Sequence, residues 1–350
     1  MDIGALATRL CIAVVISVIN LSGKSTANGP GFVSIDCGGN STYSDVNEIL
    51  WTPDSGTNGV DGEVFSVSPP AYAGLDKTPL SSIRFFRGNQ SKYCYVFDEG
   101  IVQGKAYLVR ASFWAGSQLP YRTKVANSVN FKLLIYADEW DTVLITFPQT
   151  SREVNKEIYV FAMRENIEVC LSGSTISNSD VPFISSLVLR PLSDSLHAIT
   201  FSVTYHKSRP LMTVSRKNYG APDPSYYVRY SEGQPAGYGD IYDRIWEPDT
   251  EGTRLVTDQN ITVDSNSDWV PIAVMQTARS ENSTFNLHFE VASFSWYVFY
   301  EYIAEISADV TASGQRVFSI EVRVGPMRTS FIEGHAQTFD RKTMFSAREI

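Results

Sequence analysis

The carboxylate side chains are the residues of this sequence best suited to acid–base chemistry. Their densest groups are Asp138, Glu139 and Asp141 in ADEWD, and Glu247, Asp249 and Glu251 in EPDTE. Glycoside hydrolysis needs two carboxyl groups held a few ångströms apart across a bound sugar. Asp138 and Glu139 are neighbours on a predicted strand, so their side chains point to opposite faces and do not pair easily. We therefore interpret both groups as solvated turns.

Other patterns of catalytic or metal-binding residues are missing from the sequence. It contains no G-x-S-x-G segment that would hold a nucleophilic serine. Its four histidines, His197, His206, His288 and His335, do not have the spacing of metal ligands. We expect no enzymatic activity, no metal and no cofactor, and a binding function instead.

The composition is that of a globular protein. The 350 residues are 43% hydrophobic and 19% charged, and this length makes two domains the default expectation. The formal net charge is −9, and no cluster of Lys and Arg is present. Binding to nucleic acid depends on such clusters, so the sequence argues against a nucleic-acid partner.

The first 27 residues have the pattern of a secretory signal peptide. Arg9 precedes the apolar run at 10–21, and the small residues Ser25 and Ala27 occupy the −3 and −1 positions of a cleavage site. The run is short for a membrane span, which is the alternative interpretation. No later stretch of 18 apolar residues occurs. We expect the chain in the secretory pathway and outside the cell or at its surface.

In a secreted chain, cysteines are expected to form disulfides and asparagines in N-x-[ST] triplets to carry glycans. Outside the leader the chain has Cys37, Cys94 and Cys170, so one disulfide and one leftover thiol are expected. Three pairings are open, and loop length alone slightly favours Cys37 with Cys94. Four N-x-[ST] triplets are candidate glycosylation sites in exposed loops. They begin at Asn40, Asn89, Asn260 and Asn282.

Several short segments occur twice in the same order. ILWTPD at 49–54 returns as RIWEPD at 244–249, which aligns Trp51 with Trp246 at an offset of 195. YLVRASF at 107–113 resembles YEYIAEI at 300–306, at an offset of 193, and NFKLLIY at 130–136 resembles VFSIEVR at 317–323, at an offset of 187. A slowly shrinking offset is what a duplicated domain with a longer loop in its first copy would leave.

The repeated segments have the pattern of β-strands. In VFSIEVRV, apolar residues alternate with polar ones, so one face of the strand can be buried. Similar runs are separated by segments rich in Gly, Pro and Asn, such as PDSGTNGVDG and EGQPAGYGD, and no long amphipathic helix pattern appears. We predict an all-β protein built of β-sandwich or jelly-roll domains.

A set of short motifs runs along both halves of the sequence. They are GFVSIDCGGNSTYSD at 31–45, KYCY at 92–95, YLVRASF at 107–113, LLIYADEWDTV at 133–143, VCLSGS at 169–174, PFISSLVLRPL at 182–192, YDRIWEP at 242–248 and AVMQTA at 273–278. Together these motifs resemble the malectin-like ectodomain of plant receptor kinases. The resemblance implies two tandem malectin-type β-sandwiches, which we place at 28–195 and 196–350. It also implies a cell-surface receptor with a transmembrane helix and a kinase.

The second copy is expected to be incomplete. The first copy closes with PFISSLVLRPL, and its counterpart would lie near residue 369, whereas the sequence given ends at Ile350. The segment 328–350 shows no apolar alternation that would replace the closing strand. We hypothesise a truncated product or an incomplete gene model of a longer receptor, whose contact with the membrane would come only through a missing C-terminal anchor. The alternative is a stand-alone secreted lectin-like protein.

The resemblance also implies a sugar site in the first copy. The family's aromatic positions fall on Trp51 and Trp114, its acid falls on Asp180, and Tyr121 supplies a further ring from the loop after Trp114. Stacking on an aromatic ring and hydrogen bonding to a carboxylate suit a carbohydrate. The expected partner is therefore an oligosaccharide or a cell-wall glycan. The alternative partner is a secreted peptide or a co-receptor, bound without sugar affinity.

Each candidate also has a structural interpretation. Trp51 recurs as Trp246 in a repeated segment, which favours a place in the core. Trp114 ends a strand and can pack instead of contacting a ligand, and Asp180 can cap the turn before Pro182. The chain in this region reads WAGSQLPYR, where plant relatives of the family carry a tyrosine-rich segment. Copy 2 lacks the aromatic residues at this point, so we expect it to be structural or to contact a protein.

Overall fold

The computed structural model describes a large part of the chain from residue 31 onward. The described residues are 31–45, 48–54, 61–70, 78–87, 90–117, 128–150, 152–173, 181–192, 211–212, 216–221, 240–249, 251–259, 261, 270–281, 284, 286–287, 301–312, 315–324, 327–335 and 343–345. The predicted signal peptide lies outside them. Among these residues, no helix is long and apolar enough to cross a membrane.

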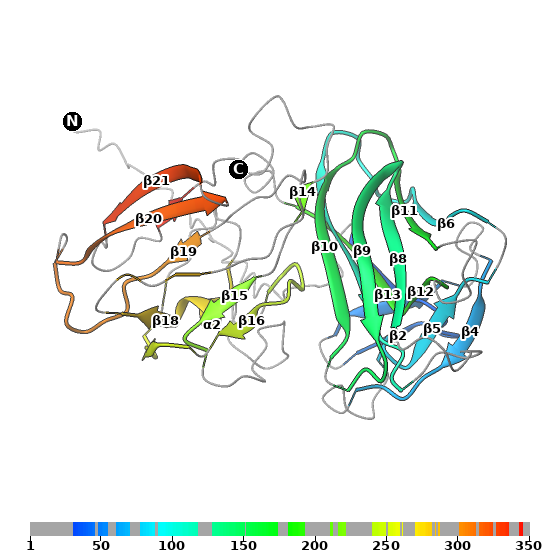
Figure 1. The fold of residues 1–350 in the computed structure, drawn as a ribbon, viewed down its shortest axis with the longest axis horizontal. Coiled ribbons are helices and arrows are strands. Elements are labelled where there is room, and N and C mark those ends of the chain that lie inside the picture. Colours follow the sequence, from blue (N-terminus) through cyan, green and yellow to red (C-terminus); the bar gives the residue numbers. More distant parts are fainter. Residues whose placement is uncertain are drawn as a thin grey trace, which may run out of the picture.

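The first half is a β-sandwich, shown on the right of Figure 1. A seven-stranded sheet has the order β14-β10-β7-β13-β1-β3-β2. A four-stranded sheet has the order β6-β11-β8-β9, and a three-stranded sheet has the order β12-β5-β4. The bounds of these strands are β1 Val33–Asp36, β2 Tyr43–Ser44, β3 Leu50–Pro53, β4 Glu63–Ser66, β5 Ser82–Phe85, β6 Tyr93–Phe97, β7 Ala106–Phe113, β8 Ser128–Ile135, β9 Asp138–Thr146, β10 Val154–Phe161, β11 Ile167–Ser172, β12 Phe183–Ile184, β13 Ser186–Pro191 and β14 Leu211–Met212.

The core of this sandwich follows from the two-residue period of its strands. In β8, residues with buried side chains alternate with more exposed ones. Phe113 of β7, Phe131 of β8 and Phe183 of β12 meet edge to face, with ring centroids 5.5 to 6.1 Å apart. Because each ring comes from a different sheet, this trio joins the three sheets of the first half.

Strand β7 is buried on both faces. All eight of its residues are buried, whereas the exposed strand β4 buries none of its four. Tyr107, Val109, Ala111 and Phe113 belong to the sandwich core. The alternate residues lie on the opposite face, from which Arg110 reaches Asp243 of the second half.

The second half, shown on the left of Figure 1, is also built of strands, with one helix of four residues among the described part. Its elements are β15 Lys217–Tyr219, β16 Glu247–Asp249, β17 Thr253–Val256, α2 Ile272–Met275, β18 Thr277–Ser280, β19 Glu301–Ile303, β20 Val317–Val324, β21 Met327–His335 and β22 Thr343–Phe345. The strands pair as β15-β16, β17-β18, β19-β22 and β20-β21. Trp246 packs with Val270, Ala273, Val274 and Met275 in a small core.

The duplication is visible in the strand pairing. In the first half β1 runs parallel to β3, with Asp36 opposite Pro53, and in the second half β15 runs parallel to β16, with Asn218 opposite Pro248. The pairs β4-β5 and β17-β18 have four residues in each strand and the same register. The chain is therefore all-β with a tandem arrangement, as the sequence predicts.

The hairpins β8-β9 and β20-β21 repeat a further detail. Each joins a strand of eight residues to one of nine through two residues. Each also has a register shift before the last two residues of its first strand, at Leu133/Leu134 and at Val322/Arg323. This places the two hairpins at an offset of 189 residues. The sequence alignment of Phe131 with Phe318 is therefore wrong by two residues, a slip that keeps the same face of the strand because its period is two.

The segment after residue 326 forms strands that the sequence pattern did not predict. β21 pairs with β20 along its length, and β22 pairs with β19. The absence of apolar alternation was a poor guide here, because main-chain hydrogen bonding to a neighbour builds a ladder with any side chains that tolerate extended backbone. Whether a closing strand is missing stays a prediction.

Candidate functional site

Trp51, the first predicted sugar contact, is a buried residue of β3. Its side chain packs with Ile49 and Val188, and it is 4% exposed. The indole N–H donates to Asp45 Oδ2 over 2.9 Å. A ring that stacks on a sugar must present a face to solvent, so the structure supports the packing interpretation of Trp51.

Trp114, the second predicted contact, is buried to the same degree. Its indole N–H donates to the carbonyl oxygen of Ser68 over 2.8 Å, and its amide donates to Ser185 Oγ over 2.9 Å. Here too the structure supports packing rather than stacking on a ligand. The other two candidates, Tyr121 and Asp180, lie outside the described residues.

The cysteine pairing differs from the one favoured by loop length. Cys94 and Cys170 form the disulfide, and Cys37 is a buried free cysteine. Cys94 of β6 stands directly opposite Cys170 of β11 in the four-stranded sheet, whereas Cys37 follows β1 in the other large sheet. The preference for Cys37 with Cys94 was wrong because neighbours in a sheet, and not in sequence, decide the pairing.

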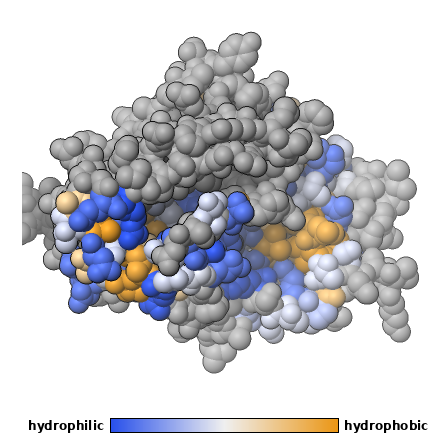
Figure 2. Space-filling view, turned by 60° about the vertical axis from the view of Figure 1, so that its left-hand side comes forward, coloured by the Kyte–Doolittle hydropathy of each residue, from blue (hydrophilic) through white to orange (hydrophobic). Residues whose placement is uncertain are grey.

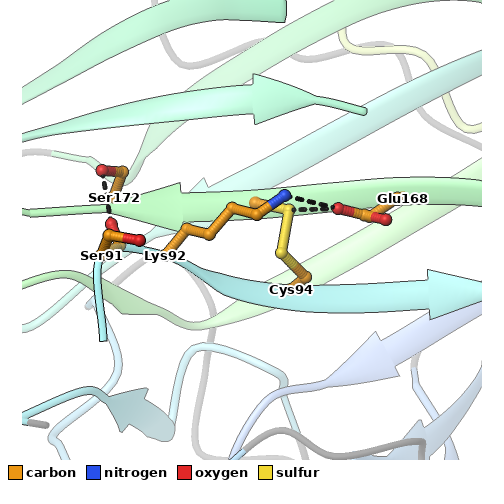
Figure 3. Close-up of a disulfide and its surroundings, with 6 residues drawn as sticks. Ser91, Lys92, Cys94, Glu168 and Ser172 are labelled. Atoms are coloured by element: carbon orange, nitrogen blue, oxygen red, sulfur yellow. Dashed lines mark hydrogen bonds and ion pairs between the residues drawn. A yellow bond between two sulfur atoms is a disulfide. The ribbon is translucent and has the colours of Figure 1, made fainter. Parts of the chain in front are cut away.

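The disulfide lies beside an ion pair, Lys92 Nζ to Glu168 Oε1 at 2.9 Å (Figure 3). Within the described part of the chain, Cys94, Glu168 and Cys170 are close enough together to suggest a metal site. Both sulfurs are already joined to each other, so they are not available as thiolate ligands. We interpret this group as a disulfide with a neighbouring surface ion pair.

The glycosylation candidates receive little structural information. Asn40 is exposed, in the loop that follows β1. Asn89, Asn260 and Asn282 lie outside the described residues. All four sites stay predictions.

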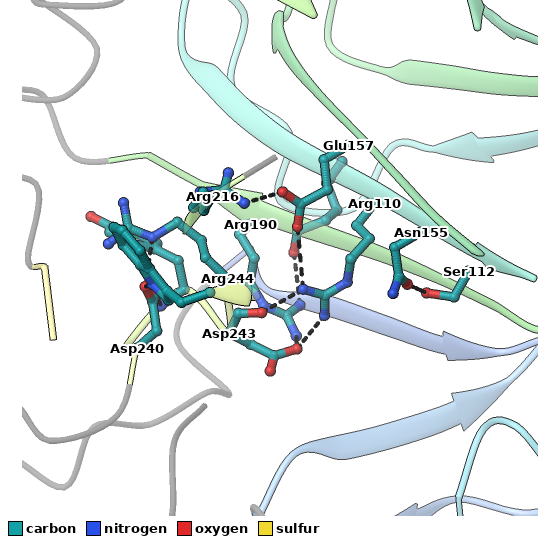
Figure 4. Close-up of polar contacts among 12 residues, drawn as sticks. Arg110, Ser112, Asn155, Glu157, Arg190, Arg216, Asp240, Asp243 and Arg244 are labelled. Atoms are coloured by element: carbon teal, nitrogen blue, oxygen red, sulfur yellow. Dashed lines mark hydrogen bonds and ion pairs between the residues drawn. The ribbon is translucent and has the colours of Figure 1, made fainter. Parts of the chain in front are cut away.

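A cluster of buried charges joins the two halves and was not anticipated from the sequence (Figure 4). Arg110 of β7 donates through its guanidinium to the carboxylate and to the main-chain carbonyl of Asp243. Arg190 of β13 lies 3.7 Å from the same carboxylate. Arg110 and Arg190 are 2% and 0% exposed, and Asp243 is 0% exposed. A carboxylate from the second half is thus held by two arginines of the first.

In a second set of contacts, the cation comes from the second half and the carboxylate from the first. Arg216, just before β15, binds the carboxylate of Glu157 on β10 and donates to the Tyr159 hydroxyl over 2.9 Å. Burial alone would lower the pKa of Arg216, but the Glu157 carboxylate and the Tyr159 hydroxyl together outweigh it, and the pKa is raised. Arg216 therefore stays charged, and each half supplies both a cation and an anion to the other.

Aromatic rings and a main-chain strand complete this junction. Phe32 of the first half stacks on Tyr242 of the second, with centroids 6.3 Å apart, and the Arg190 guanidinium lies 5.1 Å from the Phe32 ring. Strand β14 follows the predicted boundary at 195, yet it pairs with β10 and extends the first sheet. The two halves are therefore connected through side chains and through a shared sheet.

The turn that carries Asp243 is a repeat of one in the first half. Asp240 accepts from the Trp246 indole N–H over 2.7 Å, as Asp45 does from Trp51. Glu48 and Asp243, at the offset of 195, both have a positive φ, of 59° and 54°. Glu48 is partly exposed, whereas Asp243 is buried in the junction. The same turn thus makes the contact between halves only in its second copy.

The fold and the junction define two tandem β-sandwiches joined by buried charges. The family model for the malectin-like domain matches residues 35–346, and the chain belongs to this family. The family is a non-catalytic binding module, in agreement with the prediction from the sequence.

The curated relatives are plant receptor kinases. One probable LRR receptor-like serine/threonine-protein kinase of Arabidopsis thaliana is 33% identical over 261 residues, which cover 73% of this chain and 27% of that protein. Another with the same description is 30% identical over 268 residues, covering 71% of this chain and 25% of that protein. The chain thus spans about a quarter of the length of these relatives.

Solved structures share the fold at low sequence identity. The ANX2 ectodomain from Arabidopsis thaliana aligns with a TM-score of 0.58 and 15% identity, covering 89% of each chain. The plant receptor-like kinase FER aligns with a TM-score of 0.57 and 19% identity, covering 83% of this chain and 78% of that one. A further structure, with a TM-score of 0.55 and 20% identity, holds FER in complex with the plant peptide RALF23 and LLG2; the match covers 82% of this chain and 76% of that one.

Proposed function

We propose that the chain is an extracellular recognition module of the receptor-kinase type, which binds a secreted peptide or a protein partner and performs no catalysis. The observation that carries this proposal is the buried junction between the halves. A sugar site of the kind considered above lies within one sandwich and does not need a fixed second domain. A partner that contacts both halves does need one.

The buried charges fix the relation of the two halves. Asp243 must meet Arg110 and Arg190, and Glu157 must meet Arg216, for the charges to be compensated out of water. Any other orientation would leave charges buried without these partners, which is costly. The two sandwiches therefore offer one continuous surface with a defined shape, and such pre-organisation favours binding of an extended partner.

The exposed surface is compatible with a partner of mixed polarity. On the face that Figure 2 shows, hydrophobic residues gather in separate areas with hydrophilic residues between them. Non-obligate protein interfaces have this mixed composition. The solved complex of FER with RALF23 and LLG2 supports the same class of partner, because it has the same fold as this chain.

Carbohydrate binding is the second candidate. It keeps the support of the resemblance at Tyr121 and Asp180, which the described residues do not include. The buried tryptophans do not favour it. A glycan site would have to use other aromatic residues than Trp51 and Trp114 in their present positions.

One preparation of the secreted chain tests both candidates. We would measure its binding to RALF23 with and without LLG2, and to a display library of random peptides, by biolayer interferometry, and probe the same protein on a glycan array. The proposal predicts saturable binding to a peptide, weakened by Asp243→Asn, and no glycan signal. Glycan binding that persists in Asp243→Asn, together with no selected peptide, would refute it in favour of the carbohydrate module.

A further inference from the structure

A buried carboxyl group that forms no ion pair within the described residues lies at the end of β1. Asp36 is 3% exposed. Its Oδ2 accepts from the Tyr43 hydroxyl and its Oδ1 from the Ser82 hydroxyl, each over 3.0 Å. A Cβ atom on Gly39 would lie 2.7 Å from this carboxyl group, so the chain after Asp36 folds directly over it. Asp36 thus connects β1, β2 and β5 beneath the segment 37–45.

Among the described residues around Asp36, the only arginine is Arg84, and it pairs with the neighbouring carboxylate of Asp54. Arg84 of β5 binds Asp54 through two nitrogens, one of them 2.6 Å from Oδ1. Asp54 also accepts from the Tyr95 hydroxyl and from the Gly38 amide, each over 3.0 Å. The Arg84 charge is therefore largely compensated by Asp54 and is not directed at Asp36.

The groups that surround Asp36 are acids, hydroxyls and a thiol, apart from Arg84. On β2 and in the turn after it lie Tyr43 and Asp45, after β3 lies Asp54, on β5 lie Ser82 and Arg84, on β6 lies Tyr95, and directly after Asp36 lies the Cys37 thiol. On β13, Ser186 stands opposite Asp36 in the sheet. Hydroxyl groups both donate and accept, so the neutral carboxyl can keep its hydrogen bonds while the ionised one lacks a counter-charge.

The second half has the same arrangement without the charge. Asn218 of β15 stands opposite Pro248 as Asp36 stands opposite Pro53. Its Oδ1 accepts from the Thr277 hydroxyl over 2.7 Å, and Thr277 begins β18 as Ser82 begins β5. Gly38 and Gly220, two residues further on, both have a positive φ. A neutral amide therefore occupies the equivalent position in the second half, and its oxygen accepts the equivalent hydroxyl hydrogen bond.

We infer that Asp36 acts as a proton-operated latch in the first half: its neutral carboxyl holds the segment 37–45 closed on β5, and loss of the proton loosens this segment, while Asn218 keeps the second half insensitive. The inference rests on the comparison of the two copies and is independent of which partner the chain binds. The segment 37–45 of the first sandwich would thus be closed at acidic pH and loosened as the pH rises.

The direction of the pKa shift of Asp36 agrees with this inference. Burial raises the pKa of Asp36 from 3.8 to about 6, the hydrogen bonds from Tyr43 and Ser82 lower it, and Asp54 raises it. Because the pKa is higher in the closed state, the stabilisation is greatest below pH 3.8 and is lost as the pH rises to about 6. Between pH 5 and pH 7.5 these values give an increase of about tenfold in the ratio of open to closed segment.

The Cys37 thiol reports this opening. It is 0% exposed and follows Asp36 in the chain. We would measure its modification by iodoacetamide in the secreted chain, quantified by mass spectrometry of the Cys37 peptide, for the wild type and for Asp36→Asn. The ratio of the two rates cancels the intrinsic pH dependence of the thiol. We expect this ratio to rise about tenfold from pH 5 to pH 7.5.

Two further variants test the inference without relying on Asp36→Asn alone. Tyr43→Phe removes a hydrogen bond that lowers the pKa of Asp36, so the midpoint of the pH dependence should move upward. Asn218→Asp should give the second half a new loss of stability between pH 5 and pH 7.5 and leave the Cys37 ratio unchanged. A Cys37 ratio that stays within twofold across this range, or a midpoint that Tyr43→Phe does not move, would overturn the inference.

Discussion

Replacing Asp243 by asparagine should destabilise the protein strongly through the loss of one buried charge. Arg110 keeps Glu157 at 3.4 Å, but Arg190 loses the carboxylate at 3.7 Å, and both guanidinium groups stay buried. Removing one partner of a buried pair costs about 3–5 kcal/mol, and the remaining Glu157 places the expected loss near the lower value, at about 3 kcal/mol. Asparagine keeps the shape of the side chain and tolerates the positive φ of this residue, so the change isolates the charge.

The first half supplies the matched control for this prediction. Glu48 occupies the equivalent position with a similar φ and is partly exposed. Glu48→Gln should therefore cost no more than about 0.5 kcal/mol. Urea unfolding followed by tryptophan fluorescence gives both free energies of unfolding. If Asp243→Asn cost no more than Glu48→Gln, the argument that buried charges hold the halves together would fail.

Three other changes test separate parts of the structure. Trp51→Phe and Trp246→Phe should each cost about 1–3 kcal/mol, because each removes the indole donor from an aspartate of the turn, the half-buried Asp45 or the buried Asp240. Similar losses in urea unfolding would support the repeat, and a cost in only one copy would contradict it. Cys94→Ser should cost about 4 kcal/mol, since it opens a loop with a sequence separation of 76, and a thermal midpoint equal to the wild type would contradict the pairing. Cys37→Ala should abolish the one thiol that titrates in the denatured secreted protein, while a remaining thiol would show that the disulfide is formed differently.

The sequence was sufficient to predict the strands and their duplication, because both leave local signals. The segment VSID and its neighbour LWTP have the side chains of half-buried strands, and the repeated Trp-x-Pro-Asp identifies equivalent places in the two halves. The offset of the later hairpin was misjudged by two residues, because alternation with a period of two fits equally well after such a slip. The register shift that fixes the offset of 189 is a backbone feature without a side-chain signal.

The site could be predicted less well, because its residues meet only in three dimensions. Trp51 and Trp114 were candidates for ligand contact by type, but their burial depends on sheets whose packing is not encoded locally. The junction left no signal in the strand pattern: YLVRASF is apolar on one phase and carries Arg110 on the other, which is also what a strand with one solvated face shows. Its partner Asp243 is 133 residues away, and no spacing rule connects the two.

The two copies show how one turn acquired two roles. In both halves a buried tryptophan donates to an aspartate of the turn, Trp51 to Asp45 and Trp246 to Asp240, so this pair supports the same backbone in each copy. The side chain at position 48 or 243 differs between the copies. As Glu48 it stays partly exposed, and as the shorter Asp243 it reaches two arginines of the neighbouring sandwich. Because the turn geometry is common to both, the difference between a surface turn and a domain contact lies in the length of this acidic side chain and in the arginines that face it.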